Sequence, residues 1–414
     1  MDEIDVPPFF LCPISLQIMK DPVTVPTGIT YDRESIEKWL FSGKNETCPV
    51  TKQVLKDSQD LTPNHTLRRL IQAWCTMNAS FGIERIPTPK PPISKTQIQK
   101  LIREAKSPQS QIKCLRKLRS IAAESETNKR CLEAAGAAEF LASLIIINNN
   151  NFASFEAFEV DDLNSARISD EALSILFNLQ LSESVLKNLI GKNGDFIESL
   201  LIIMKSGSYE SRAYAVMLLK SMFEVADPMR MISLRIEFFV ELVQVLHDQI
   251  SNQATKSTLQ MLIQLSPWGR NRVKAVESGA VSVLIQILLD NTDRRICEMT
   301  LAVLDLLCGC AEGRAELLRH SAGLAIVSKK IMRVSLVGSE KAVRILLSIS
   351  KFSATSAVLQ EMLQLGVVAK LCLVLQVDCG SKTKERAREI LKLHARTWRN
   401  SSCVPSHLLS FYPA

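Results

Sequence analysis

The feature that most constrains this 414-residue chain is an internal repeat of helical segments over its C-terminal three quarters. Each copy begins with a short turn, usually holding a glycine, and continues as an apolar segment such as "SGAVSVLIQIL" from 278. The equivalent turn positions follow one another at spacings of 58, 43, 42, 44 and 43 residues, and they are Gly136, Gly194, Glu237, Gly279, Gly323 and Gly366. A chain with this regularity is expected to build the same structural unit several times over.

A second helical segment with small and apolar residues precedes these copies, for example "CEMTLAVLDLLCGCA" from 297. Units of about 40–47 residues with two or three helices are typical of armadillo and HEAT repeats, whose units bury their apolar faces only by stacking. The predicted fold of this region is therefore an all-α armadillo-repeat solenoid with a long groove. Glycine at the turn ends one helix with a positive φ, so position 237, which lacks glycine, is expected to have a different turn.

The array is predicted to cover residues 96–400, followed by a C-terminal tail at 401–414. Its first spacing is long because it contains the polar run "NNNNFASFEAFEVDDLNS" at 148–165. Removing most of this run restores a spacing near the others. The run is therefore predicted to be a mobile loop inserted in one repeat.

Residues 5–80 mix strand and helix signals and are predicted to form a small α+β domain. Asn64 and His65 precede apolar residues at helical spacing, which indicates the start of a helix. The segment that follows, residues 81–95, contains the proline-rich stretch "ERIPTPKPPISK". Its prolines forbid a continuous helix and favour extended geometry, so it is predicted to be a semi-rigid linker.

Composition narrows the possible classes of function. The net charge is +7, but no stripe of Arg and Lys interleaved with aromatic residues occurs, so no nucleic-acid partner is expected. No apolar run approaches the ~18 residues of a membrane span, and the acidic start "MDEID" does not resemble a signal peptide. Eleven scattered cysteines without a C-x-x-C pair favour free thiols and an intracellular location, cytoplasmic and also nuclear.

A metal site and a cysteine nucleophile are both poorly supported in the N-terminal domain. Cys12 and Cys48 each precede a proline and lie 36 residues apart, whereas a double-zinc finger needs about eight closely paired ligands. Neither cysteine has a basic neighbour in sequence that would clearly lower its pKa. Both are predicted to be buried apolar thiols that pack the loops, and the sequence predicts no catalytic residue, metal or cofactor.

What remains is a rigid surface made by two Cys-Pro loops and the segment 33–42. This segment is predicted to be a helix, with Asp32 as its N-cap and Glu34 in its first turn. The apolar residues that this surface offers are Ile14, Leu16, Trp39, Pro49 and Val50. Apolar side chains on proline-stiffened loops around a tryptophan suit the docking of another protein. Spacing alone leaves open the alternative that Ile14, Leu16 and Trp39 all belong to the core.

The stretches "FLCPISLQIMKDPVTVPTGITYDRESIEKWL", "CPVTKQVL" and "LTPNHTLRRLIQAW" strongly resemble the U-box, the zinc-free relative of the RING finger, over about residues 5–79. The order of U-box, proline-rich linker and armadillo array resembles the plant U-box/armadillo E3 ubiquitin-protein ligases. The linker "GIERIPTPKPPI" resembles the branch of that family linked to defence and stress signalling.

The resemblance implies that the U-box recruits a ubiquitin-conjugating enzyme (E2) and activates its ubiquitin thioester, while the armadillo groove binds a protein substrate. No ubiquitin is held covalently on the chain itself. The implied E2 contacts are Ile14, Leu16, Trp39, Pro49 and Val50. Lys52 stands at the position of the family's cationic linchpin, where many members have an arginine with a planar fork that lysine lacks.

The resemblance also implies that polar contacts and a small core replace the two zinc ions. The residues expected to form this scaffold are Cys12, Asp21, Asp32, Arg33, Glu34, Asn64 and His65. Self-association, with the same chain or a relative, stays open.

The alternative function is a non-catalytic armadillo adaptor, which only Lys52 favours, whereas Ile14, Trp39 and Pro49 favour the ligase. Nuclear-import cargo binding fits less well, because it needs regularly placed Trp and Asn, and Trp268 is the only tryptophan between 95 and 390.

Overall fold

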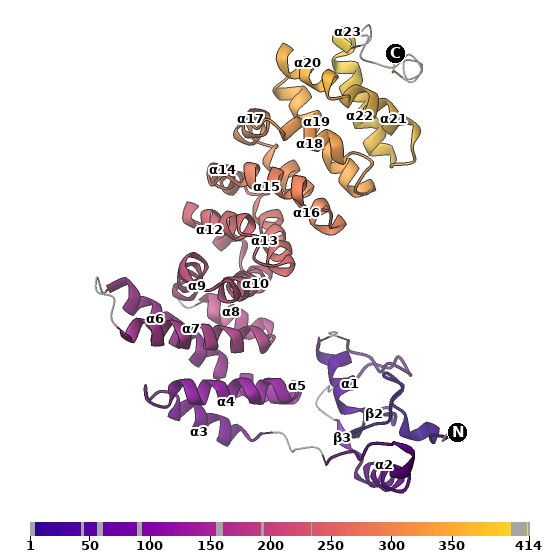
Figure 1. Ribbon diagram of the computed structural model, residues 1–414, viewed down its shortest axis with the longest axis vertical. Coiled ribbons are helices and arrows are strands. Elements are labelled where there is room, and N and C mark those ends of the chain that lie inside the picture. Colours follow the sequence, from indigo (N-terminus) through magenta and orange to yellow (C-terminus); the bar gives the residue numbers. More distant parts are fainter. Residues whose placement is uncertain are drawn as a thin grey trace. The chain divides into compact units, whose positions relative to one another are not determined.

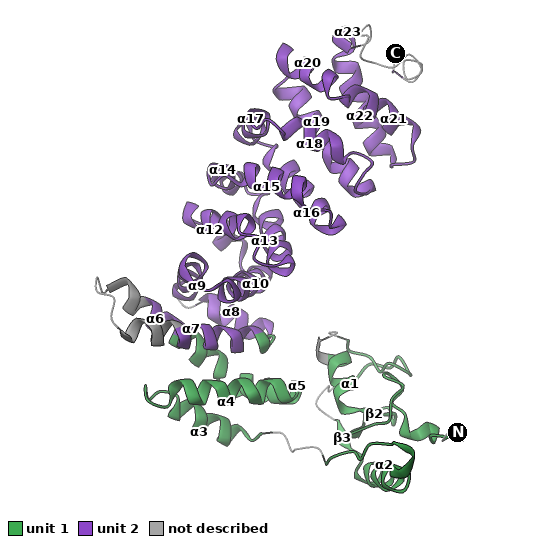
Figure 2. Ribbon diagram, in the orientation of Figure 1, with its two compact units in different colours: residues 1–144, 178–181 green, residues 145–177, 182–414 purple. Residues whose placement is uncertain are grey.

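The computed structural model describes residues 5–42, 45–55, 61–88, 93–154, 160–191, 194–232, 234–398 and 412. The chain divides into two compact units, residues 1–144 with 178–181, and residues 145–177 with 182–414 (Figure 2). The first unit holds the α+β domain and the first armadillo helices. The second unit holds the rest of the array. The expected tail at 401–414 and residues 89–92 of the expected linker lie outside the described residues, apart from Tyr412.

The N-terminal domain is built on a small antiparallel sheet (Figure 1). Its strands β1 (Pro22–Thr24), β2 (Thr30–Asp32) and β3 (Thr62–Pro63) lie in the order β2-β1-β3, with Val23 opposite both Tyr31 and Pro63. Helix α1 (Arg33–Glu37) continues as a π-helical turn over Lys38–Ser42, and helix α2 (His65–Met77) follows β3. Short 3-10 turns cover Pro8–Phe10 and Ala79–Phe81.

Helix α2 begins where the sequence predicts it. The side chain of Asn64 accepts a hydrogen bond from the backbone N–H of Leu67 at 3.0 Å and so caps the helix. Ile71 and Cys75, one turn apart, are buried in the domain core. Residues from the whole N-terminal domain and one from the expected linker, Ile86, complete the core; the others are Phe10, Cys12, Met19, Val23, Val25, Tyr31, Ile36, Leu40, Cys48 and Leu55.

The rest of the described chain is helical, as predicted. The helices are α3 (Lys95–Glu104), α4 (Gln111–Glu124), α5 (Glu126–Ala134), α6 (Ala137–Ser154), α7 (Val160–Asn178), α8 (Glu183–Gly191), α9 (Asp195–Ser206), α10 (Tyr209–Val225), α11 (Pro228–Ile232), α12 (Ile236–His247), α13 (Asn252–Leu265), α14 (Gly269–Glu277), α15 (Ala280–Asp290), α16 (Arg294–Leu307), α17 (Ala311–Arg319), α18 (Gly323–Lys330), α19 (Leu336–Phe352), α20 (Ser356–Gln364), α21 (Val367–Gln376), α22 (Ser381–Leu393) and α23 (Ala395–Trp398). In the second unit α10, α13, α16, α19 and α22 pack on one another in succession. These five helices are called the long-helix row below.

The repeated turns follow the prediction with one exception. Gly136, Gly194, Gly279 and Gly366 have positive φ angles, and the turn without glycine instead has Arg235 in an extended conformation before α12. Gly323 has no positive φ. A Cβ atom there would lie 1.9 Å from the carbonyl oxygen of Leu317, so glycine is needed for close packing of α18 against α17 rather than for its backbone conformation.

The predicted loop at 148–165 is helical over much of its length. Helix α6 runs through Ser154 and α7 begins at Val160, while residues 155–159 lie outside the described part. Asn149 is buried and donates a hydrogen bond from Nδ2 to the carbonyl oxygen of Ser199 at 2.8 Å. The prediction of a loop is therefore wrong for residues 148–154 and 160–165, because an amide with a buried partner is tolerated inside a helix.

Across the residues described, no single helix is long and apolar enough to cross a bilayer. Two pairs of consecutive helices reach that length only when joined, and they are bent by 69° and 64°.

We predict that Gly323→Ala lowers the free energy of unfolding of the array by about 2 kcal/mol, because the added methyl group overpacks against a backbone carbonyl. Gly269→Ala is the matched control, since Gly269 is also the first residue of its helix and a Cβ there meets nothing within 4 Å. Urea unfolding of the intact chain, followed by circular dichroism, compares the two. Equal stability of both variants would contradict the close-packing role.

Candidate docking face of the N-terminal domain

Two loops of this domain have the same construction. Loop 1 (residues 12–17) and loop 2 (residues 48–53) share the pattern C-P-x-[S/T]-x-Q. In each loop the cysteine N–H donates to the carbonyl oxygen of the glutamine, at 2.9 Å in loop 1 and 2.8 Å in loop 2. The fifth residue of each loop donates its N–H back to the cysteine carbonyl, at 2.8 and 2.9 Å. The sequence signal for this equivalence is the full six-residue pattern, whereas the Cys-Pro pair alone does not predict it.

The fifth residue of each loop has an unusual backbone. Leu16 has φ 57° and Lys52 has φ 60°, a region that residues other than glycine seldom adopt and that costs of order 1 kcal/mol. The hydrogen bonds within each loop hold this conformation. Both side chains are exposed, Leu16 at 75%, so the strained residue of each loop is also presented to solvent.

The two cysteine sulfurs hold the loops as hydrogen-bond acceptors. Cys12 Sγ accepts the backbone N–H of Asp32 at 3.3 Å. Cys48 Sγ lies 3.0 Å from the Tyr31 hydroxyl and accepts a hydrogen bond from Thr27 Oγ1 at 3.4 Å. Both thiols are fully buried, as predicted, but they are more than apolar packing, since each connects its loop to β2.

These contacts shift the acidity of the groups involved. Burial by itself would raise the pKa of the Cys48 thiol, but hydrogen bonds from Thr27, Thr51 and Tyr31 outweigh it and lower that pKa to about 6. Burial and the neighbouring Cys48 raise the pKa of the Tyr31 hydroxyl. The Tyr31 oxygen also accepts the backbone N–H of Val50 at 3.3 Å, so one buried tyrosine fixes two positions of loop 2.

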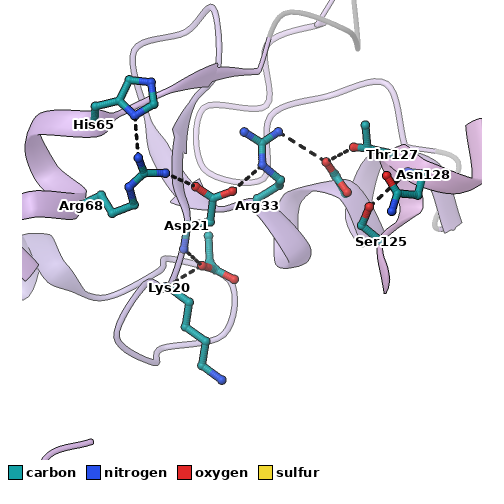
Figure 3. A network of polar contacts seen from close by, with 10 residues as sticks. Lys20, Asp21, Arg33, His65, Arg68, Ser125, Thr127 and Asn128 are labelled. Carbon is teal, nitrogen blue, oxygen red and sulfur yellow. Dashed lines mark hydrogen bonds and ion pairs between the residues drawn. The ribbon is translucent and has the colours of Figure 1, made fainter. Parts of the chain in front are cut away.

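A polar network connects the residue before β1 with helices α1 and α2 (Figure 3). Arg33 Nε lies 2.6 Å from Asp21 Oδ2, and Arg68 Nη1 lies 3.5 Å from Asp21 Oδ1. Asp32 Oδ1 accepts the backbone N–H groups of Lys20 and Asp21 at 2.8 and 2.9 Å. Sequence reasoning missed Arg68, because nothing in the helical pattern of α2 distinguishes it from its neighbour Arg69.

The structure corrects the expected role of Asp32. Asp32 occupies the N-cap position of α1, yet its side chain makes no capping hydrogen bond. Its carboxylate is directed instead to the strand entry at Lys20 and Asp21. Asp32 does precede the helix, as its sequence position suggests. Its carboxylate nevertheless bonds the backbone N–H groups of Lys20 and Asp21 rather than those of the first turn of α1.

Glu34, Asn64 and His65 contribute unequally to the expected scaffold. Glu34 is 73% exposed and pairs with Lys38, four residues later in the chain, at 2.6 Å, so its effect on stability is small. Asn64 caps α2 and lies 3.5 Å from Thr24 on β1. His65 Nδ1 lies 2.9 Å from Arg68 Nη2, which places it at the edge of the Asp21 network.

Trp39 is held beside loop 2. Its Nε1 donates to the carbonyl oxygen of Thr47 at 2.8 Å, and Lys52 Nζ lies 5.8 Å from its ring centroid, a cation–π distance. Trp39 and Ile14 are half-buried against the core. The alternative that Ile14, Leu16 and Trp39 are all core is therefore wrong for Leu16 and holds only in part for the other two.

These residues define what we call the docking face: exposed or half-buried side chains from both loops around Trp39, namely Ile14, Leu16, Trp39, Pro49, Val50 and Lys52. In the part of the chain that is described, no group of three or more Cys, His, Asp or Glu side chains could hold a metal ion. Rigid backbone, exposed aliphatic groups and one cation make a surface suited to a protein partner.

Comparison with known proteins identifies both regions. The U-box domain family matches residues 6–80, and the family described as the plant U-box protein ARM repeat region matches residues 97–414. The chain is 59% identical to E3 ubiquitin-protein ligase PUB22 of Arabidopsis thaliana, covering 100% of the chain and 99% of the relative. It is 58% identical to E3 ubiquitin-protein ligase PUB23 of the same plant, covering 100% and 98%.

We predict that Asp21→Asn destabilises the N-terminal domain by about 2 kcal/mol, because the two arginines lose a charged partner. In the intact chain this appears as roughly 30-fold faster hydrogen exchange of the slowest amides in β1 and β2. Glu34→Gln is the matched control, because Glu34 follows Arg33 on the same helix but pairs with the exposed Lys38, and it is expected to change these rates less than about threefold. If the two variants exchanged alike, the Asp21 network would not be the scaffold.

Proposed function

Because the chain belongs to the plant U-box/armadillo family of E3 ubiquitin-protein ligases, we propose that its docking face binds an E2 loaded with ubiquitin. The observation that best supports this is the pair of equivalent loops, which present Leu16, Val50 and Lys52 around Trp39 on a rigid backbone. An E2 must leave after each transfer to be recharged. A small apolar face with one cation suits such a transient partner.

The reaction needs no nucleophile from this chain. The Nζ of a substrate lysine attacks the carbonyl carbon of the E2–ubiquitin thioester, an isopeptide C–N bond forms, and the C–S bond breaks to release the E2 thiolate. The attacking amine loses its proton to a base on the E2 or to water. Cys12 and Cys48 are fully buried and engaged as acceptors, so the U-box acts by positioning the loaded E2.

Lys52 is proposed to be the linchpin that bonds the E2 and ubiquitin together. Its backbone is fixed by the hydrogen bond to Cys48 and its ammonium group lies over the Trp39 ring. A lysine offers a compact charge but not the bidentate fork of arginine. Weak activation through Lys52 is the one feature that favours the adaptor function over the ligase.

The armadillo array is proposed to bind the protein substrate. Ion pairs connect neighbouring helices of the long-helix row, at 3.2 Å between Lys256 and Asp293, 3.1 Å between Arg344 and Asp305, and 2.8 Å between Arg386 and Glu340. These pairs join successive members of the row from α13 to α22. Holding a substrate along the array would raise its effective concentration near the E2.

We also propose a regulatory role in plant defence and stress signalling and a cytoplasmic location that extends to the nucleus. The resemblance of the linker sequence to the defence and stress branch of the family supports the regulatory role. Ten cysteines in the described chain are unbridged, which suits a reducing compartment and supports the second.

We predict that Leu16→Ala slows discharge of the loaded E2 onto free lysine at least tenfold, because it truncates an exposed contact of the docking face. The folded domain is expected to be unaffected, since Leu16 is 75% exposed.

Ile14→Ala and Trp39→Ala should abolish ubiquitin chain formation. Thermal unfolding is measured alongside, because both side chains also touch the core. Phe81→Ala is the control, since Phe81 is 66% exposed on the same domain but outside the face. Full activity of Leu16→Ala and Trp39→Ala would refute the docking face. If the native chain itself were inactive, the ligase function would be wrong and the non-catalytic adaptor would remain.

We predict that Lys52→Arg raises the discharge rate about fivefold and that Lys52→Gln lowers it by a similar factor, because a forked cation bonds two partners better than a point charge. Lys38→Arg, on the same domain but paired with Glu34, is the control and is expected to leave the rate unchanged. Equal rates for all three variants and the native chain would remove Lys52 from the mechanism.

A further inference from the structure

Glu37 is a buried charge that the docking face does not use. Its side chain is 2% exposed, whereas Glu34 on the same helix is 73% exposed. Within the U-box its ion-pair partner is Arg33, whose Nη1 lies 3.6 Å away while its Nε is bonded to Asp21. A carboxylate removed from water needs more compensation than one long ion pair provides.

Helix α5 of the armadillo region provides that compensation (Figure 3). The hydroxyl of Thr127 donates a hydrogen bond to Glu37 Oε1 at 2.5 Å. Thr127 and Glu37 lie in the same compact unit, and α1 and α5 are in contact there. Thr127 is the second residue of α5, after the N-cap Ser125, so the carboxylate lies at the positive end of the helix dipole.

Charges on the two helices are complementary around this hydrogen bond. Arg130, about one turn along α5, is attracted to Glu37 as well as to Glu126. Lys38, next to Glu37 on the U-box, is attracted to Glu126. Acidic and basic side chains are thus present on both sides of the contact.

The first turn of α5 is fixed before it meets Glu37. Ser125 Oγ accepts the backbone N–H of Asn128 at 3.1 Å, and Asn128 Nδ2 donates to the carbonyl oxygen of Ile121 at 3.2 Å. The other amide atom, Asn128 Oδ1, accepts the N–H of Ile93 at 3.2 Å. The end of the linker and helix α1 of the U-box are therefore both bound to this turn.

The contact leaves the docking face uncovered. Glu37 ends α1, whereas Trp39 lies in the π-helical turn that follows and donates to the carbonyl oxygen of Thr47, next to loop 2. Leu16 and Val50 remain 75% and 53% exposed with α5 in place. An E2 bound at the docking face would meet no obstacle from the Glu37 contact.

We propose that Glu37 is a positioning residue, which holds the U-box on the first armadillo helices through Thr127 and so fixes where the loaded E2 is presented to substrate lysines. The contact between Glu37 and Thr127 does not depend on ligase activity, whereas its effect on ubiquitin transfer rests on the proposed function. Because the hydrogen bond needs the Thr127 hydroxyl, any group that adds negative charge there is expected to release the U-box.

The test is hydrogen exchange of the intact chain over residues 33–37 and 126–134. Thr127→Asp is expected to speed exchange of both segments about tenfold, because two carboxylates then face each other. Unfolding of α5 is not an alternative cause, since an acidic residue in the first turn stabilises a helix. Thr127→Ser retains the hydroxyl and is expected to exchange like the native chain.

Two further variants separate this contact from general effects. Thr96→Asp is the matched control, because Thr96 is also the second residue of its helix, α3, and is exposed. Glu37→Gln added to Thr127→Asp is expected to return exchange toward the native rate, since the repulsion is removed. Unchanged exchange in Thr127→Asp, or the same acceleration in Thr96→Asp, would overturn the proposal.

A second readout tests the consequence for transfer. Thr127→Asp is expected to leave E2 discharge onto free lysine unchanged, while the set of lysines modified on the chain itself, mapped by mass spectrometry, shifts. If exchange were accelerated but the set of modified lysines stayed the same, the contact would exist and only the positioning role would be wrong. A native chain without discharge activity would refute the ligase function, whereas the exchange data would still decide whether the contact exists.

Discussion

The U-box of this chain depends on hydrogen bonds to two buried sulfurs and two carboxylates, in the absence of any group of side chains in the described residues that could hold a metal. Cys12 and Cys48 each close a loop on itself through backbone bonds and attach it to β2 through sulfur. Asp32 fixes the chain entry to the sheet. Each such bond contributes about 1 kcal/mol, and because Cys12 and Cys48 bond the adjacent residues Asp32 and Tyr31, both loops are attached to the same strand.

The strained residues at the loop tips follow from this rigidity. A leucine or lysine with positive φ persists only where its surroundings determine the backbone. Here the same two hydrogen bonds per loop enforce it at Leu16 and at Lys52. The result is an exposed aliphatic group and an exposed cation held in equivalent places, which is the property that an E2-docking surface needs.

Helix α1 and the π-helical turn after it show how a short segment can serve three neighbours. Ile36 faces the core, Trp39 is bonded to Thr47 just before loop 2, and Glu37 meets helix α5 of the armadillo region. The buried polar contact of Glu37 adds little net stability by its nature, since desolvation offsets most of the attraction. Its value lies in specifying one arrangement of U-box and first armadillo helices, because another arrangement would leave a buried charge without its partner.

Periodicity and capping are local properties of the chain, and they suffice to predict the repeat, the helical class of the array, the start of α2 and the burial of both loop cysteines. Contacts in the folded chain place Asn149 inside a helix, direct the Asp32 carboxylate to a strand entry instead of the first turn of α1, and bury Glu37 against Thr127, 90 residues away in sequence. They also require glycine at position 323, beside a carbonyl of α17. The partners of Asn149, Asp32 and Glu37 lie at least 11 residues away in the chain, where no local pattern reveals them, and a buried polar group takes whichever partner removes it from water at least cost.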